Sequence, residues 1–190
     1  MNFREYYLRE IGDRIIEPSN VDLKIRYGVG KEPVFHYTFV LTLNDIERRY
    51  YVQIDPFEYT DMPEVGLSVD FGIYDESLEH PYTTDLTGDH EPLTVLSNVV
   101  GIVKRCLRLD LLKEFDDSYI KDKLYLSMIR FSAVKEDIED KRREKLYERV
   151  IKTQLKQLNI EIRDIIKIGS AAEQEEVGFT IKPIKIKDIK

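Results

Sequence analysis

The sequence predicts an α+β domain in which a mostly antiparallel sheet carries two long amphipathic helices on one face. Four segments of alternating apolar and polar residues follow one another in the N-terminal half, with no helical pattern between them. Consecutive strands without intervening helices are typical of an antiparallel meander. Further along, two segments with apolar residues at helical spacing alternate with additional strand patterns, which indicates helices that pack on the same sheet.

The N-terminal strands are predicted from period-two patterns. A short helix over residues 1–15 is expected before them, because aromatic and apolar residues near Phe3 give it an irregular apolar side. The alternation then covers residues 21–29, 35–43, 46–54 and 65–73. Two residues, Asn44 and Asp45, separate the second strand from the third, and this spacing favours a tight hairpin.

A helix is predicted after an acidic loop at residues 75–91. Pro92 fits the first position of this helix, which runs to about Leu112. Its polar side, with Ser97 and Gly101, is expected to meet solvent as in an amphipathic surface helix.

The remaining segments complete the predicted sheet. Residues 124–134 have the nearly continuous apolar character of a central strand. Residues 137–158 are predicted to form the second helix, with a Glu148–Lys152 ion pair on its surface and Asn159 as C-cap. Weaker strands are expected at 160–168 and 177–184, and the Lys-rich tail at 182–190 is expected to protect an edge strand.

Length and composition indicate one domain that spans residues 1–190. At 190 residues, with 42% hydrophobic and 34% charged residues, the chain can bury a sizeable core. The one cysteine, Cys106, excludes an internal disulfide. The N-terminus lacks the apolar core of a signal peptide, and no apolar run approaches the roughly 20 residues of a membrane span. We therefore expect a protein of the cytosol, or one assembled from it.

Charge is distributed unevenly along the chain. The formal net charge is −7, yet residues 50–103 contain eleven carboxylates and no lysine or arginine, and the residues after them carry an excess of positive charge. This polarity suggests that one face of the molecule meets something positive, which could be a cation, a basic protein or only solvent. The candidate interaction residues are Asp55, Glu58, Asp61, Glu64, Lys141, Arg142 and Arg143. The acidic balance argues against direct binding of nucleic acid.

Residues 70–91 contain the ligand types of a divalent-metal site. Asp75, His80, Asp89 and His90, together with Asp70, would supply carboxylates and imidazoles. Their spacing matches no metal signature, so a solvated acidic loop is favoured, with no metal and no cofactor.

No catalytic residue is predicted. Cys106 falls on a helix without a histidine nearby in the sequence, and Gly28–Lys31 lacks the full spacing of a phosphate loop. His36 lies on the polar side of the second strand and is expected to be an ordinary surface residue.

Five short motifs between residues 86 and 181 occur together in one known group of proteins. They are Leu86-Thr87-Gly88-Asp89, Val95-Leu96-Ser97-Asn98-Val99-Val100, Ile129-Arg130-Phe131-Ser132-Ala133, Lys145-Leu146-Tyr147-Glu148-Arg149 and Gly178-Phe179-Thr180-Ile181. With these motifs the chain resembles small virion-associated proteins of tailed bacteriophages. The resemblance implies that Phe131 and Tyr147 lie in the core, and it supplies no catalytic motif.

The leading hypothesis is a non-enzymatic phage structural or assembly protein that makes protein–protein contacts in a virion, as a ring, neck or capsid-associated component. Its partners would be other virion proteins or copies of itself, with no membrane and no direct nucleic-acid contact. It would be found in the virion, and in the host cytoplasm during assembly. Two alternatives stay open: an acidic inhibitor of a host nucleic-acid-binding or defence protein, and a metal-dependent hydrolase that uses residues 70–91.

Overall fold

The computed structural model describes residues 15–28, 33–43, 45–58, 64–74, 82–83, 92–115, 122, 124–134, 141–168 and 174–189. These residues form an eight-stranded sheet. Its strands are β1 (Val21–Tyr27), β2 (Pro33–Leu43), β3 (Ile46–Glu58), β4 (Glu64–Tyr74), β5 (Tyr82–Thr83), β6 (Tyr125–Val134), β7 (Ile162–Ile168) and β8 (Gln174–Lys185). The helices are α2 (Pro92–Arg105), the π-helix η1 (Cys106–Asp110), α3 (Leu111–Glu114), α5 (Lys141–Gln157) and the short 3₁₀-helix η2 (Ile186–Asp188).

The sheet confirms the predicted class. Its strand order is β1-β2-β3-β4-β6-β8-β7, with β5 paired to β4. The first four strands form the predicted antiparallel meander, and the β4–β6 pairing is parallel while the other pairs are antiparallel. The hairpin between β2 and β3 is also confirmed: Leu43 pairs with Ile46, and Asp45 has a φ of 63°, the left-handed conformation that a two-residue turn requires.

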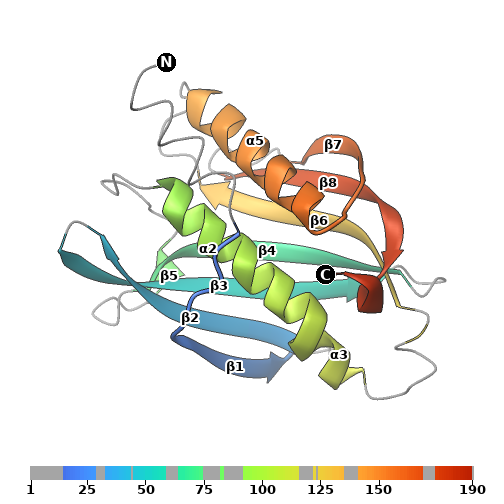
Figure 1. Cartoon of the computed structure of the whole chain (residues 1–190), viewed down its shortest axis with the longest axis horizontal. Helices are drawn as coiled ribbons and strands as arrows, with labels where there is room; N and C mark the ends of the chain where they lie inside the picture. Colours follow the sequence, from blue (N-terminus) through green and yellow to red (C-terminus); the bar gives the residue numbers. More distant parts are fainter. Residues whose placement is uncertain are drawn as a thin grey trace.

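Both helical segments lie on the same face of the sheet (Figure 1). The first begins at Pro92, as predicted, and α2, η1 and α3 follow one another in it without a break. The second, α5, has 17 residues. Two long helices were expected, and that detail is wrong: a π turn interrupts the first segment. The expected start of the second at residue 137 lies outside the described residues.

The core lies between the sheet and these helices. Alternate residues of β2 and β3 face it, and cross-strand pairs such as Tyr37–Val52 and Phe35–Ile54 are fully buried. Phe131 is 2% exposed, in agreement with the core position that the phage resemblance implies, whereas the side chain of Tyr147 lies outside the described ones. Burial of this apolar surface is the main driving force for the fold.

The polar side of α2 is buried, contrary to the prediction. Ile16 N–H donates a hydrogen bond to the Ser97 carbonyl at 3.3 Å, and Gln154 of α5 donates from Nε2 to the Ser97 hydroxyl at 2.9 Å. A Cβ at Gly101 would lie 2.0 Å from the Ile16 carbonyl oxygen. The chain before β1 therefore packs directly on this side of the helix, and a glycine permits the close approach.

The C-terminal residues also differ from the prediction. β8 is an interior strand between β6 and β7, so the tail does not protect an edge. After β8 the chain turns into η2, and Ile186 and Ile189 are buried. The Ile186 N–H donates to the Leu124 carbonyl at 3.0 Å. The apolar members of the Lys/Ile alternation thus anchor the tail in the core.

The end of α5 follows the predicted signal. Asn159 has a φ of 59°. Ile160 N–H donates to the Leu155 carbonyl at 3.1 Å, and Asn159 N–H donates to the Lys156 carbonyl at 3.0 Å. This pair of hydrogen bonds is the Schellman C-cap, in which a left-handed residue ends the helix. The expected N-terminal helix lies outside the described residues, and of the acidic loop at 75–91 the structure describes Tyr82 and Thr83 alone.

Candidate interaction surfaces

The outward side of α5 carries a row of cations. Arg149, Lys152 and Lys156 are three and four residues apart, so the helix places them on one side, and all three are exposed. The opposite side of α5 is buried through Val150, Ile151, Gln154 and Leu155. Because that side is fixed against the rest of the protein, the three cations point outward. We call them the cationic stripe.

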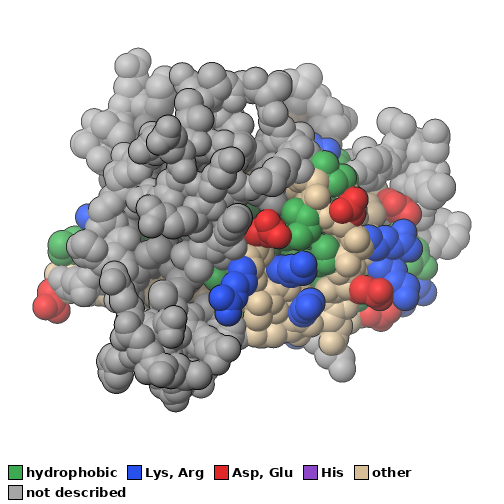
Figure 2. Space-filling model, turned by 90° about the horizontal axis from the view of Figure 1, so that it is seen from above, with side chains coloured by type: hydrophobic (Ala, Val, Ile, Leu, Met, Phe, Trp, Pro, Cys, Tyr) green, Lys and Arg blue, Asp and Glu red, His purple; other side chains and the backbone are tan. Residues whose placement is uncertain are grey.

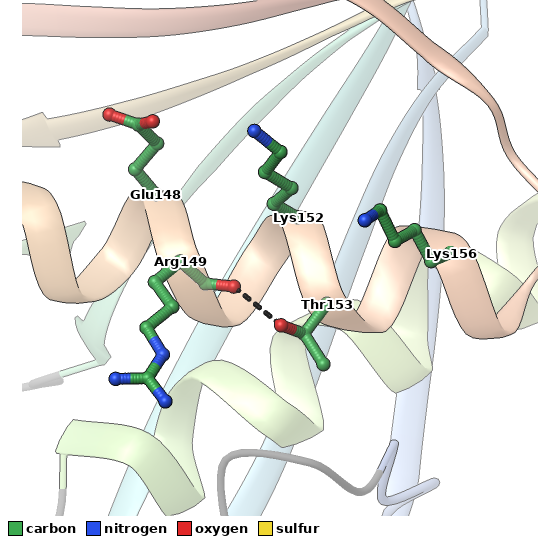
Figure 3. Close-up of a pocket in the computed structure, with 5 residues that line it drawn as sticks. All are labelled: Glu148, Arg149, Lys152, Thr153 and Lys156. Carbon is green, nitrogen blue, oxygen red and sulfur yellow. Dashed lines mark hydrogen bonds between the residues drawn. The ribbon is translucent and has the colours of Figure 1, made fainter.

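A surface hollow of about 320 Å³ lies along the cationic stripe. Figure 3 shows its lining along the exposed side of the helix: in this view Glu148, Lys152 and Lys156 project upward from that side, and Arg149 and Thr153 project downward from it. The Thr153 hydroxyl donates to the Arg149 carbonyl at 2.9 Å, so its proton is used within the helix. The hollow therefore offers three cationic groups, with one carboxylate among them.

The cations of the stripe are not neutralised by their described neighbours. Within the described part of the chain, no carboxylate forms an ion pair within 4.0 Å of any of them. The predicted Glu148–Lys152 pair is accordingly not formed. Figure 2, which views the molecule from above, shows Lys and Arg side chains at the centre and right of this face, with Asp and Glu side chains among them. Exposed cations of this kind keep their charge available for a partner.

The predicted basic residues lie at the start of the same helix. Positions 141 and 145 are lysines that precede Arg149 by eight and four residues, so helical spacing aligns them with the stripe. Position 143 is turned about 200° from position 141 at about 100° per residue. Lys141, Arg142 and Arg143 therefore belong to α5 but do not share one side, and their side chains lie outside the described ones.

The predicted acidic residues lie around the connection between β3 and β4. Glu58 ends β3 and Glu64 begins β4. Asp55 accepts a hydrogen bond from Gln53 Nε2 at 2.8 Å and is half-buried. Since alternate residues of a strand face opposite sides, positions 55 and 64 lie on the face away from the helices and position 58 on the helix side. The side chain of Glu58, and Asp61 as a whole, lie outside the described residues.

Asp55 lies beside a cation of the neighbouring strands. In the sheet it pairs with Ser68, which in turn pairs with Arg130. The Arg130 guanidinium carbon lies 4.4 Å from the centre of the Phe57 ring. A cation is thus held in the same cross-strand row as Asp55, while positions 58 and 64 lie at the strand ends.

The predicted acidic and basic positions lie at opposite ends of the fold. In Figure 1, β3 ends and β4 begins at the right of the sheet, whereas α5 begins at the left. β4 ends and α2 begins at the left, the same end as the start of α5. The carboxylates that lie away from the start of α5 are therefore those of the β3–β4 end.

A second polar cluster is buried beneath the π-helix. The Tyr37 hydroxyl donates to Asp110 Oδ2 at 2.8 Å. Arg105 Nε and Lys113 Nζ lie 3.6 Å and 3.7 Å from the Asp110 carboxylate oxygens. Asp110 is 5% exposed, so its charge is balanced within the protein. Single π turns within α-helices are frequently found at functional sites.

The chemistry of this cluster is that of a structural contact. Burial raises the pKa of the Cys106 thiol to about 12, and it also raises the pKa of the adjacent Tyr37 hydroxyl. The thiolate is the nucleophilic form of cysteine, and Cys106 is 0% exposed. At neutral pH it is therefore a protonated thiol without access to a substrate in solution.

The metal candidates lie mostly outside the described residues. Asp75, His80, Asp89 and His90 are not described, and Asp70 lies on β4. Within the described part of the chain, no group of three or more His, Cys, Asp and Glu residues is suited to hold a metal. His36 lies on β2 and is half-buried rather than fully at the surface, and desolvation lowers its pKa.

Sequence patterns located the beginning of the cationic surface but missed its length. Lysine or arginine occurs at positions 141, 145, 149, 152 and 156, a spacing of four, four, three and four residues. This signal was present in the sequence. The interleaved acidic residues at 136–144 concealed it, because they make the start of the helix look evenly mixed in charge. The buried Tyr37–Asp110 contact joins residues 73 positions apart, and no local pattern indicates it.

Comparisons of the chain with protein-family models, with curated proteins and with solved structures find no match. None of the helices in the described part of the chain is long and apolar enough to cross a lipid bilayer. Function must therefore be inferred from the surfaces themselves.

Proposed function

We propose that this chain is a non-enzymatic assembly protein of a tailed-phage virion, which contacts copies of itself or neighbouring virion proteins. The observation that supports this most is the separation of charge: the carboxylate-bearing β3–β4 end and the basic start of α5 lie at opposite ends of the fold (Figure 1). In this proposal the two helical segments on one face of the sheet have different roles. The first holds the core together, and the second presents charge to a partner.

Opposite charges at opposite ends favour head-to-tail association. Such a contact is made by two different patches, and it closes into a ring when the rotation between subunits permits. Electrostatic complementarity mainly guides encounter and partner choice, and salt weakens it when the charges are exposed. The proposed assembly is therefore salt-sensitive.

The test is the molar mass by light scattering during size exclusion, at about 0.05 M and about 0.5 M salt, where the Debye length falls severalfold. A discrete oligomer at low salt that dissociates at high salt is the expected result. A monomer at both salt concentrations would overturn self-association. A pull-down from infected host lysate would then separate assembly with other virion proteins from inhibition of a host protein.

A further inference from the structure

We propose that the edge strand β1 pairs antiparallel with β1 of a second copy of this chain, so that the two sheets join across a two-fold axis. β1 lies at one margin of the sheet (Figure 1), and within the described part of the chain it is paired with β2 alone. Alternate N–H and C=O groups of an edge strand point away from its neighbour and can pair with an added strand. This surface differs from the charged ends of the head-to-tail contact, and the inference does not depend on that contact.

The opposite edge strand, β7, is less suited to such pairing. Its register with β8 shifts between Ile162 and Asp164, and a bulge of this kind bends the strand that contains it. Asp164 Oδ1 accepts a hydrogen bond from the Ile165 N–H at 2.8 Å, so a side chain already occupies this backbone donor. Bulges and charged side chains both protect edge strands from pairing. β1, in contrast, pairs with β2 over all seven of its residues without a register shift.

The side chains of β1 divide into an apolar side and a charged side. The apolar side packs at the margin of the core, where it is half-buried, and consists of Val21, Leu23 and Ile25. The exposed side consists of Asp22, Lys24 and Arg26. Among the residues that the structure describes, no ion-pair partner lies within 4.0 Å of these three, and the residues opposite them on β2 carry no carboxylate. Their charges therefore suit a strand that is added beside β1.

Charge selects the register of the added strand. The apolar sides of both copies lie on one face only if the two-fold axis passes through a residue position, because a slip of one residue turns the side chains to the other face. With the axis at Leu23, each Asp22 lies opposite Lys24 of the other copy, and the two Leu23 side chains meet. An axis at Asp22 or at Lys24 would place identical charges opposite each other, which destabilises the pair. An axis at Ile25 would place Lys24 opposite Arg26, with the same cost.

The position of α3 supports the same register. The Tyr27 hydroxyl donates to Glu114 Oε2 at 2.8 Å, and Glu114 ends α3, so the last residue of β1 is held beside that helix. With the axis at Leu23, the new ladder extends from Val21 to Ile25 and leaves Tyr27 outside it. The five paired residues span about 17 Å. The pairing also removes apolar side chains at the margin of the core from water, which favours association.

Hydrogen exchange of β1, followed by mass spectrometry, tests the pairing directly. Two protein concentrations about a hundredfold apart are compared, since mass action favours the dimer at the higher one. We expect about two or three N–H groups of a peptide over residues 19–27 to exchange more slowly there, because alternate N–H groups point toward the added strand. A peptide over β7 should exchange equally at both concentrations. Equal exchange of β1 at both concentrations would overturn the inference.

Two charge variants of β1 test the register. D22K places like charges opposite each other, so we expect the Kd of the dimer to rise at least about tenfold. D22K/K24D exchanges the two charges within the strand, keeps the composition and net charge of the natural chain, and should restore the dimer. E47K makes the same change in charge as D22K at an exposed residue of the interior strand β3 and should keep the natural Kd.

Sedimentation equilibrium gives these Kd values, after circular dichroism has confirmed that each variant is folded. If D22K/K24D pairs as weakly as D22K, the register centred on Leu23 is wrong. An equal loss in E47K would show that net charge, and not β1, controls association, and would overturn the inference.

The same measurements separate this inference from the proposed head-to-tail assembly. A salt-sensitive oligomer in which β1 exchanges equally at both concentrations would support head-to-tail assembly and overturn the β1 pairing. A dimer with protected β1 that persists at about 0.5 M salt, without a larger species at low salt, would have the opposite meaning. In that case the backbone ladder of β1 joins the copies, and the charged ends do not.

Discussion

The first helical segment (92–114) and α5 lie on the same face of the sheet, yet they are buried to very different extents. In α2 every residue from Val95 to Val103 is buried. In α5 one side is buried while Arg149, Lys152 and Lys156 are exposed. The difference follows from what covers the two helices, since the chain at 15–17 and Gln154 of α5 both contact the polar side of α2.

This comparison shows that an amphipathic pattern alone does not decide which side of a helix meets solvent. The polar side of α2 is made of small residues such as Ser97 and Gly101, which allow another backbone to approach closely. The polar side of α5 is made of long cations, which are costly to bury without partners. The size of the polar residues therefore distinguishes the two cases. Small polar residues indicate a helix that is covered on two sides, and long charged residues indicate a surface helix.

The largest effect should come from truncating the buried side of the first segment. Leu107 is 0% exposed, whereas Leu109, two residues away in the same π-helix, is 51% exposed. We expect Leu107→Ala to lower the free energy of unfolding by about 2–5 kcal/mol. The matched Leu109→Ala should change it by less than about 0.5 kcal/mol. Urea denaturation measures both values, and equal losses would contradict the assigned orientation.

Alkaline pH should weaken the contact between the first segment and β2. The folded pKa of Cys106 is about 12, against 9.0 for the exposed thiol, so the unfolded chain loses this proton first. Stability is therefore full below about pH 9 and falls by up to about 1.4 kcal/mol per pH unit above it. Tyr37, whose pKa is also raised from 10.0, adds to the fall above about pH 10.

The slope of the free energy of unfolding against pH reports the titrating groups, whereas lost packing lowers that free energy equally at every pH. Cys106→Ala should flatten the slope between about pH 9 and pH 10, and Tyr37→Phe should flatten it above about pH 10. Urea denaturation across this pH range gives the slopes directly. A slope that is the same in the natural chain and in Cys106→Ala would show that the thiol is not protected in the fold.

Gly101→Ala tests whether the small polar side of α2 is covered. Alanine normally stabilises a helix by about 1 kcal/mol relative to glycine. Here its Cβ would meet the Ile16 backbone at 2.0 Å, so we expect a net loss of about 1–3 kcal/mol in urea denaturation. A gain in stability would mean that residues 15–17 do not pack against α2 in solution.

The smallest effect is expected on the outward side of α5. K152E/K156E should change the free energy of unfolding by less than about 1 kcal/mol, and most of that change should come from Lys156 in the last turn, where a cation favours the helix dipole. Thermal or urea denaturation of the monomer at high salt gives this value. A loss as large as that of Leu107→Ala would show that the stripe has a structural role.

Local patterns predicted much of the fold. The alternation of residues 65–73 predicted β4, the Asn44-Asp45 spacing predicted the hairpin, and Pro92 and Asn159 marked the ends of the helices. Each of these patterns determines the backbone conformation of only a few neighbouring residues. The sequence was therefore informative wherever a structure depends on local conformation.

Tertiary contacts explain the errors. Gly101 looked exposed because nothing in its own helix indicates that Ile16 covers it. The Lys/Ile alternation of the tail looked like an edge strand because the placement of β7 outside β8 cannot be read from β8 itself. The cationic stripe could be recognised only once the helix was defined, because its exposed side then follows from the structure over about two turns.

The position of β6 has a consequence for how the chain folds. β6 is paired with β4 on one side and with β8 on the other, and α5 and β7 lie between β6 and β8 in the sequence. The meander β1–β4 can form from neighbouring segments as soon as they are synthesised, whereas β6 keeps one open edge until almost the last residues emerge. An unpaired apolar edge is a place where unfinished chains adhere to one another. The slow step in producing this protein is therefore expected to be the insertion of β8, and a chaperone that protects β6 would raise its yield.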